Sequence, residues 1–207
     1  MRFLVPLILL VSACSSSDAT VVAQASPVDT EPITISMSLY VIDDSAADSP
    51  LSSQRQLTEL EEIAARMNDI WGEAGVELAV ETVARIEAPA AVLTDLAAGT
   101  TSSFLDAAVG GGIDVPGPAT INGFYVRRIG TANGMTPFGT RVFFVADEPT
   151  VNDERVSSHE VGHILGLHHA LDDSGRLMFS GTNGTALVDA EITTARYAAT
   201  GILDGLR

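Results

Sequence analysis

Cysteine and basic side chains are both scarce in this chain, which excludes internal disulfides and argues against polyanionic partners. The only cysteine among the 207 residues is Cys14, so no disulfide can form within the chain. Eleven basic side chains stand against 27 acidic ones, which gives a formal net charge of -16. Because nucleic acids and anionic lipid surfaces would repel such a chain, we expect neither as a partner. With 46% hydrophobic residues, the chain can still build one domain with a full core.

A long hydrophobic run is also missing. The apolar stretch Phe3 to Val11 has nine residues, whereas a membrane-spanning helix needs about 20, so we expect no permanent transmembrane segment. Arg2 precedes this stretch, and the small residues Ser12 and Ala13 come just before Cys14. This arrangement is typical of a signal peptide and resembles a bacterial lipobox.

The lipoprotein resemblance implies an exported protein that is anchored in the cell envelope. Residues 1–13 would be removed as a signal peptide, Cys14 would carry the lipid, and residues 14–31, rich in small polar residues, would form a flexible tether. Ser15 after the lipidated cysteine fits the outer membrane or cell surface if the host is Gram-negative. Ordinary cleavage near Ala13 is the alternative.

Residues 32–207 are expected to form the folded domain, which opens with a strand, a helix and a second strand. Apolar residues alternate with small polar ones at 33–41 and again at 76–81, the period of a strand with one buried face. Between them, residues 57–71 place apolar side chains at three- and four-residue steps, which predicts a helix backing the sheet. Ser53 and Gln56 offer a capping box at its start.

The rest of the domain mixes helices with short apolar segments. An alanine-rich stretch at 89–109 predicts helix, with an interruption at 99–101. Further elements are expected in chain order: a loop at 110–118, apolar segments at 121–129 and 141–146 with a turn-rich stretch between them, a helix at 153–165 and a C-terminal helix at 190–203. We therefore expect an α+β fold.

All four histidines lie between positions 159 and 169, which points to a metal site. His159 and His163 are four residues apart on the predicted helix, so both imidazoles project from one face and can bind one ion, with Glu160 beside it. Gly166 can adopt the left-handed conformation that turns the chain back and brings His169 up as a third ligand. The fourth position stays open for water, as a catalytic zinc ion requires.

The string His159-Glu160-x-x-His163-x-x-Gly166-x-x-His169 resembles the metzincin clan of zinc peptidases. The resemblance implies a metzincin-like single domain, with a twisted mixed sheet of about five strands, an active-site helix, a backing helix and a C-terminal helix. It also implies one catalytic zinc ion on the three histidines and Glu160 as the general base. The clan spacing favours His169 over its neighbour His168. We assign His168 to the rim of the site or to the groups around the metal ligands, and a merely exposed position is the alternative.

Met178 follows the third histidine by nine residues, where a metzincin with a short connection, such as a matrixin, carries its Met-turn. Taken alone, this methionine would be a filler of core space. By the same resemblance, Gly134, Met135 and Thr136 form the edge strand on which an extended peptide would pair. Unlike matrixins, the chain has Ser180 and Gly181 after the Met-turn, so the wall of a specificity pocket is not assigned.

The resemblance implies a secreted, lipid-anchored zinc metalloendopeptidase, with a peptide or protein as substrate and a monomeric state. Two alternatives stay open: a zinc-binding lipoprotein that has lost catalysis and acts as a binding module, and a zinc hydrolase of a non-peptide amide. Asp106, Asp114 and the glycines at 110–112 offer oxygen ligands, but they form no recognisable calcium motif. Calcium therefore stays open and without support.

Overall fold

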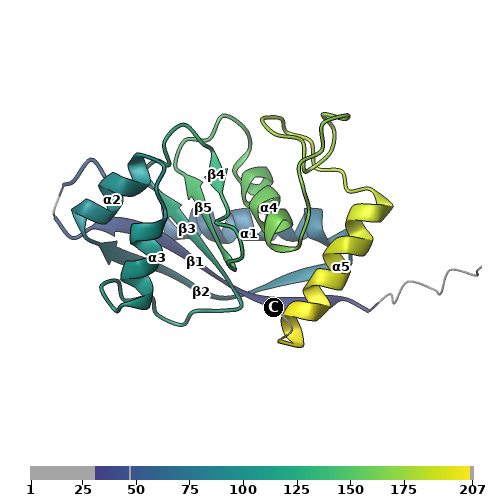
Figure 1. Cartoon of the computed structure of the whole chain (residues 1–207), viewed down its shortest axis with the longest axis horizontal. Coiled ribbons are helices and arrows are strands. Elements are labelled where there is room, and N and C mark those ends of the chain that lie inside the picture. The colour runs from purple at the N-terminus through teal and green to yellow at the C-terminus, as the bar shows by residue number, and fades with distance from the viewer. Residues whose placement is uncertain (1–30, 47, 206–207) are drawn as a thin grey trace, which may run out of the picture. The chain divides into compact units, whose positions relative to one another are not determined.

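The computed structural model describes residues 31–46 and 48–205, which belong to one folded unit (Figure 1). It is an α+β fold with a five-stranded mixed sheet in the order β2-β1-β3-β5-β4. The strands are β1 (Ile33–Asp44), β2 (Val76–Ala88), β3 (Ile121–Val126), β4 (Gly134–Met135) and β5 (Val142–Ala146). The helices are α1 (Leu57–Gly72), α2 (Ala90–Ala97), α3 (Ser102–Val109), α4 (Asp153–Ile164) and α5 (Asp189–Leu203). The expected fold class is confirmed.

Four strands run parallel and β4 runs antiparallel to its only sheet neighbour, β5. The interior strand β1 is buried along most of its length because it pairs with β2 on one side and β3 on the other. Strand β2 extends to Ala88, well past the predicted end at residue 81. Past residue 81 the alternation of buried and exposed side chains is lost, since much of this edge strand is exposed. The strand continues because its backbone still pairs with β1.

Each face of the sheet has its own hydrophobic core. Leu39, Tyr125 and Phe143 point to the face covered by α1, α4 and α5, whereas alternate residues such as Tyr40 and Phe124 point to the face covered by α2 and α3. This is the consequence of side chains alternating along a strand. The sheet is therefore a middle layer, and the helix that carries the histidines packs on only one side of it.

Helix α1 begins at Leu57, as the periodicity of residues 57–71 predicted, and not directly after Ser53. Its N-cap is Gln56, whose backbone N–H donates to the Glu59 carboxylate at 2.7 Å. The expected capping box of Ser53 with Gln56 is wrong, because the Ser53 hydroxyl instead donates to Asp147 at 2.6 Å. A tertiary partner has replaced a local one.

Arg55 fixes the start of α4 against the end of β5. Its guanidinium donates to the backbone oxygens of Ala146, at 3.2 Å, and Asp147, at 2.6 Å, and forms an ion pair with Asp153 in the first turn of α4. One turn further, the hydroxyls of Tyr125 and Ser157 lie 2.9 Å apart. These buried polar contacts place α4 at a defined height above the sheet.

No helix within the described ranges is both long enough and apolar enough to cross a membrane. Cys14, the predicted signal peptide at 1–13 and nearly all of the predicted tether at 14–31 lie outside the described residues.

Candidate metal centre

Three histidines converge where α4 ends. His159 and His163 extend from the helix, and the chain then turns at Gly166, whose φ of +82° is a conformation that glycine adopts without a steric penalty. The N–H of Leu167 donates to the Gly162 carbonyl at 2.9 Å and closes the turn. His169 returns to the helix, and its Nε2 lies 3.1 Å from Nε2 of His163.

The geometry of this cluster fits a transition-metal ion. One ligand atom from each of the three histidines lies within 4.8 Å of the others. Zinc–nitrogen bonds of about 2.0–2.1 Å in a tetrahedron place two ligand nitrogens about 3.3 Å apart, close to the 3.1 Å seen between His163 and His169. Three protein ligands leave one tetrahedral position for water or substrate.

Backbone carbonyls set the tautomer of two of these ligands. Nδ1 of His159 lies 2.8 Å from the Leu177 oxygen, and Nδ1 of His163 lies 3.0 Å from the Leu167 oxygen. Because a carbonyl only accepts, each Nδ1 must carry the hydrogen, and the Nε2 lone pairs are left for a metal. Burial also lowers the pKa of His159 to about 4 and lowers the pKa of His163, which favours the neutral, ligating form.

Glu160 lies next to the histidines but is held by a different element. The Thr136 hydroxyl, just past β4, lies 2.8 Å from Oε2 of Glu160 and 2.9 Å from its backbone oxygen. Burial raises the pKa of this carboxyl to about 7, while the bond from Thr136 and the charge of Arg155 act in the opposite direction. A carboxyl with a pKa near neutrality can accept and release a proton at physiological pH.

The segment around Met178 lies beneath α4. Met178 is fully buried, and its Sδ would stand 2.6 Å from a Cβ at Gly162, so the glycine makes room for the methionine. The Met178 carbonyl accepts the N–H of Ala170 at 2.9 Å, which joins this segment to the residue after His169. The structure therefore places Met178 directly below the helix that carries two histidines.

Arg155 is a residue of this site that sequence reasoning missed. Its side chain is buried, and its guanidinium donates to the Leu177 carbonyl at 2.8 Å and to the Phe179 carbonyl. Leu177 thus accepts from both Arg155 and His159. An arginine one turn before His159, on the same helix face, was the available signal.

Strand β4 lies at the edge of the sheet next to α4, and it contains two of the three residues expected to form the substrate strand. A Cβ at Gly134 would stand 2.8 Å from Oε1 of Glu160 and from a methyl of Val156, so the strand and helix are in close contact. Met135 pairs with Phe144 of β5, and Thr136 follows the strand. On its other side β4 has no neighbour in the sheet.

His168 is exposed and does not belong to the cluster of three histidines. It lines a cavity of about 420 Å³ that also includes His163, so it lies at the rim of the site. Within the described residues, His159, His163 and His169 form the only group of at least three potential side-chain ligands of the His, Cys, Asp or Glu type. Asp106 and Asp114 take part in no such group, and the calcium expectation gains no support from it.

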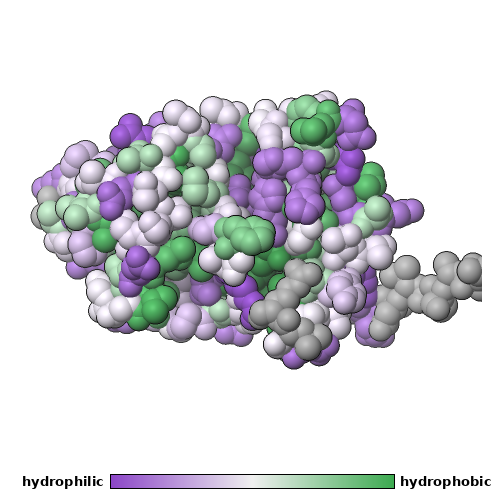
Figure 2. Space-filling model, viewed as in Figure 1, coloured by the Kyte–Doolittle hydropathy of each residue, from purple (hydrophilic) through white to green (hydrophobic). Residues whose placement is uncertain are grey.

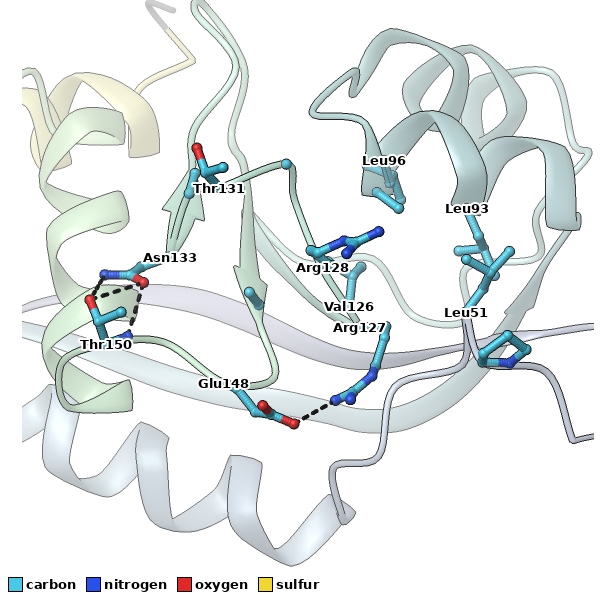
Figure 3. Close-up of a pocket in the computed structure, with 15 residues that line it drawn as sticks. Leu51, Leu93, Leu96, Val126, Arg127, Arg128, Thr131, Asn133, Glu148 and Thr150 are labelled. Carbon is cyan, nitrogen blue, oxygen red and sulfur yellow. Dashed lines mark hydrogen bonds and ion pairs between the residues drawn. The ribbon is translucent and has the colours of Figure 1, made fainter.

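A larger cavity, of about 610 Å³, lies near the carboxyl ends of β3 and β5 (Figure 3). Leu93 and Leu96 of α2 form part of its wall, and Arg127 on the other side pairs with Glu148 at 2.9 Å. None of the histidines and no part of Glu160 lines it. This cavity therefore lies apart from the cluster of histidines and from Glu160.

No family model matches this sequence, and no curated protein matches it. Among solved structures, the chain is similar to archaemetzincin from Methanopyrus kandleri, with a TM-score of 0.55 and 16% sequence identity over 85% of this chain and 99% of that one. It is also similar to a chain in a structure described as a chaperone–substrate complex, with a TM-score of 0.53 and 16% identity over 83% of this chain. This chain spans only 35% of that second one. The likeness to archaemetzincin shows a metzincin-like fold, and the three clustered histidines lie within it.

Proposed function

We propose that the protein is a zinc metalloendopeptidase with His159, His163 and His169 as metal ligands. The observation that carries the proposal is the convergence of three imidazoles around a space of zinc dimensions, with a buried carboxyl beside them. The metzincin-like fold supports it independently, because one of the solved structures with a similar fold is named archaemetzincin. Met178 would be the Met-turn residue of this site.

Several residues of this chain have separate roles in the proposed reaction. Bound zinc would lower the pKa of a water molecule towards 7 and polarise the scissile carbonyl. Glu160 accepts the proton of the attacking water and delivers it to the leaving amine, a role that needs a carboxylate near the metal but not bound to it. Thr136 holds that carboxylate through its hydroxyl, and the open edge of β4 pairs with the backbone of an extended substrate.

The decisive experiment combines metal analysis with peptide digestion. The purified protein is incubated with a mixed peptide library, with and without a chelator, and cut positions are identified by mass spectrometry. We expect chelator-sensitive cleavage and one zinc per chain. Glu160→Gln should keep the zinc and lose nearly all cleavage, while the matched control Glu62→Gln, an exposed position on α1, should cleave like the parent.

Two results would contradict this proposal. Equal cleavage by Glu160→Gln and the parent would show that another group is the base. Stoichiometric zinc without any cleavage would favour the binding module, or a hydrolase of a non-peptide amide, over a peptidase.

We further propose that the protein is exported and lipid-anchored through Cys14 to the cell envelope. The support is the sequence pattern of residues 1–14. Metabolic labelling with a fatty acid in a bacterial host should mark the parent and not a Cys14→Ala variant. Equal labelling of both would exclude the anchor.

A further inference from the structure

A cavity of about 420 Å³ adjoins the metal centre at the C-terminal end of α4. One wall is the loop 136–141 between β4 and β5, the opposite wall is the end of α4 with the following turn, and Ile202 of α5 also lines it. His163 belongs to this lining, so the cavity opens directly beside one of the proposed zinc ligands. The volume is in the range of ligand pockets, roughly 300–1,000 Å³.

The residues that line the cavity indicate which kind of substrate side chain it would bind. Its apolar members are Pro137, Phe138, Ile164, Leu167 and Ile202. No aspartate or glutamate lines the cavity, although the chain as a whole has 27 acidic residues. Arg141 also lines the cavity, so a basic side chain would meet a like charge and no carboxylate there. The apolar members would instead cover a large apolar side chain, whose burial is favourable.

Phe138 on the rim supports this reading. Its relative exposure is 103%, so the aromatic ring is fully open to water. Figure 2 shows hydrophobic residues at the surface over the loop between β4 and β5, in the centre of this face. An exposed aromatic ring at the mouth of a cavity is typical of a surface that an apolar ligand covers.

The direction of β4 decides which part of a substrate reaches the cavity. The strand runs from Gly134 towards Thr136, and the cavity begins at Thr136 and continues along the chain to Arg141. An extended peptide added to this edge pairs most favourably antiparallel to it. It then runs the opposite way, so the residues beyond Thr136 face the part of the peptide that precedes the bond next to Glu160.

We infer that this cavity is a specificity pocket for a large apolar side chain on the N-terminal side of the scissile bond. The inference rests on the proposed peptidase function and adds a substrate class to it. Apart from His163, this pocket is built from residues that take no part in zinc binding. Its recognition can therefore be measured by binding as well as by cleavage.

The test uses the zinc-loaded protein and short acetylated peptides that end in a hydroxamate. The hydroxamate binds the zinc, so the peptide must extend to the N-terminal side of the site. We expect acetyl-Leu-Leu-hydroxamate to bind about tenfold more tightly than acetyl-Gly-Gly-hydroxamate, as the burial of a leucine side chain allows. Phe138→Ala, a surface change, should reduce this ratio at least about threefold.

Tyr197→Ala is the matched control, since this aromatic side chain lies on α5, is 77% exposed and does not line the cavity. It should leave the ratio unchanged. The inference is overturned if both hydroxamates bind equally, or if Phe138→Ala leaves the ratio as it is. It is also overturned if library cleavage selects apolar residues only after the cut bond.

These outcomes separate the pocket from the peptidase. If the zinc-loaded protein prefers the leucyl hydroxamate but cleaves no peptide, the pocket assignment stands and the peptidase function is refuted. If peptides are cleaved with no preference for apolar residues before the scissile bond, the peptidase function stands and the pocket assignment is refuted. A chain that takes up no zinc overturns both.

Discussion

Nδ1 of His159 lies 2.8 Å from the carbonyl oxygen of Leu177, and this bond joins the helix of the metal centre to the segment of Met178. It links residues 18 positions apart in the chain. The same carbonyl accepts a bond from Arg155, so a buried cation and a proposed metal ligand share one acceptor. Several properties of the site should depend on this arrangement.

Arg155→Met should weaken zinc binding about tenfold or more, because it removes the group that fixes the Leu177 carbonyl and hence the His159 ring. It should also destabilise the zinc-free fold by about 1–3 kcal/mol, since buried carbonyls lose a donor. Zinc affinity is measured by competition with a chromophoric chelator, and stability by urea unfolding. Arg155→Lys should recover part of the affinity, and Arg128→Met, an exposed position after β3, serves as the control. Loss of stability with unchanged zinc affinity would assign Arg155 a purely structural role.

His169→Ala should lower zinc affinity far more than His168→Ala, because only His169 lies within ligand distance of the other two histidines. Loss of one of three protein ligands should cost at least about 100-fold, as even changes to groups that support a ligand cost 10–100-fold. Metal titration of both variants is the measurement. A larger loss for His168→Ala would show that the wrong neighbour had been chosen.

Thr136→Val removes the hydroxyl that holds Glu160 while it keeps the shape of the side chain. We expect kcat for peptide cleavage to fall on the order of tenfold, because general-base catalysis depends on the position of the base. Zinc content should stay at the parent value. Thr131→Val, an exposed position before β4, is the control. Parental kcat in Thr136→Val would mean that Glu160 needs no support from this hydroxyl.

Gly162→Ala should destabilise the protein by about 1–3 kcal/mol, because the new Cβ would stand 2.6 Å from Sδ of Met178 in a packed interior. The control, Gly201→Ala in α5, has open space around the new Cβ and should stabilise the helix by roughly 0.5–1 kcal/mol. Thermal unfolding of the two zinc-free variants gives the comparison. Equal stability of the two variants would refute close packing of Met178 beneath α4.

The zinc-free protein should show a pH-dependent difference in stability from Glu160→Gln. Burial raises the pKa of Glu160 from its ordinary 4.5 to about 7 in the folded state, so between these values the folded protein holds a proton that the unfolded chain releases. The stability that this proton confers on the parent is present below pH 4.5 and is lost as the pH rises through 7. Glutamine does not titrate, so the variant should be the more stable form at pH 8, and its advantage should shrink by up to about 1.4 kcal/mol per pH unit towards pH 5.

His159 contributes the opposite trend, because its pKa is lowered to about 4 and the unfolded chain protonates first on acidification. Both proteins contain His159, so its contribution cancels in the difference. Urea unfolding at several pH values measures the effect. A difference that does not change with pH would show that Glu160 is not desolvated in the zinc-free state.

Local sequence patterns were sufficient wherever neighbouring residues decide the outcome. The periodicity of residues 57–71 predicted α1, and the interruption at 99–101 predicted the break between α2 and α3. The four-residue spacing of His159 and His163 placed both on one helix face, as helix geometry requires. The capping box at Ser53 failed because Asp147, distant in sequence, competes for the same hydroxyl.

By itself, the sequence determined that His159, Glu160, His163 and His169 stand at positions suited to a metal site, because spacing on a helix and a glycine turn are local properties. Only the tertiary structure decided what surrounds them: Thr136 on Glu160, Arg155 on Leu177, and an apolar cavity beside His163. These contacts join segments far apart in the chain, or depend on which buried side chain reaches which carbonyl. A periodic pattern in the sequence does not predict such contacts, because they depend on how the whole domain packs.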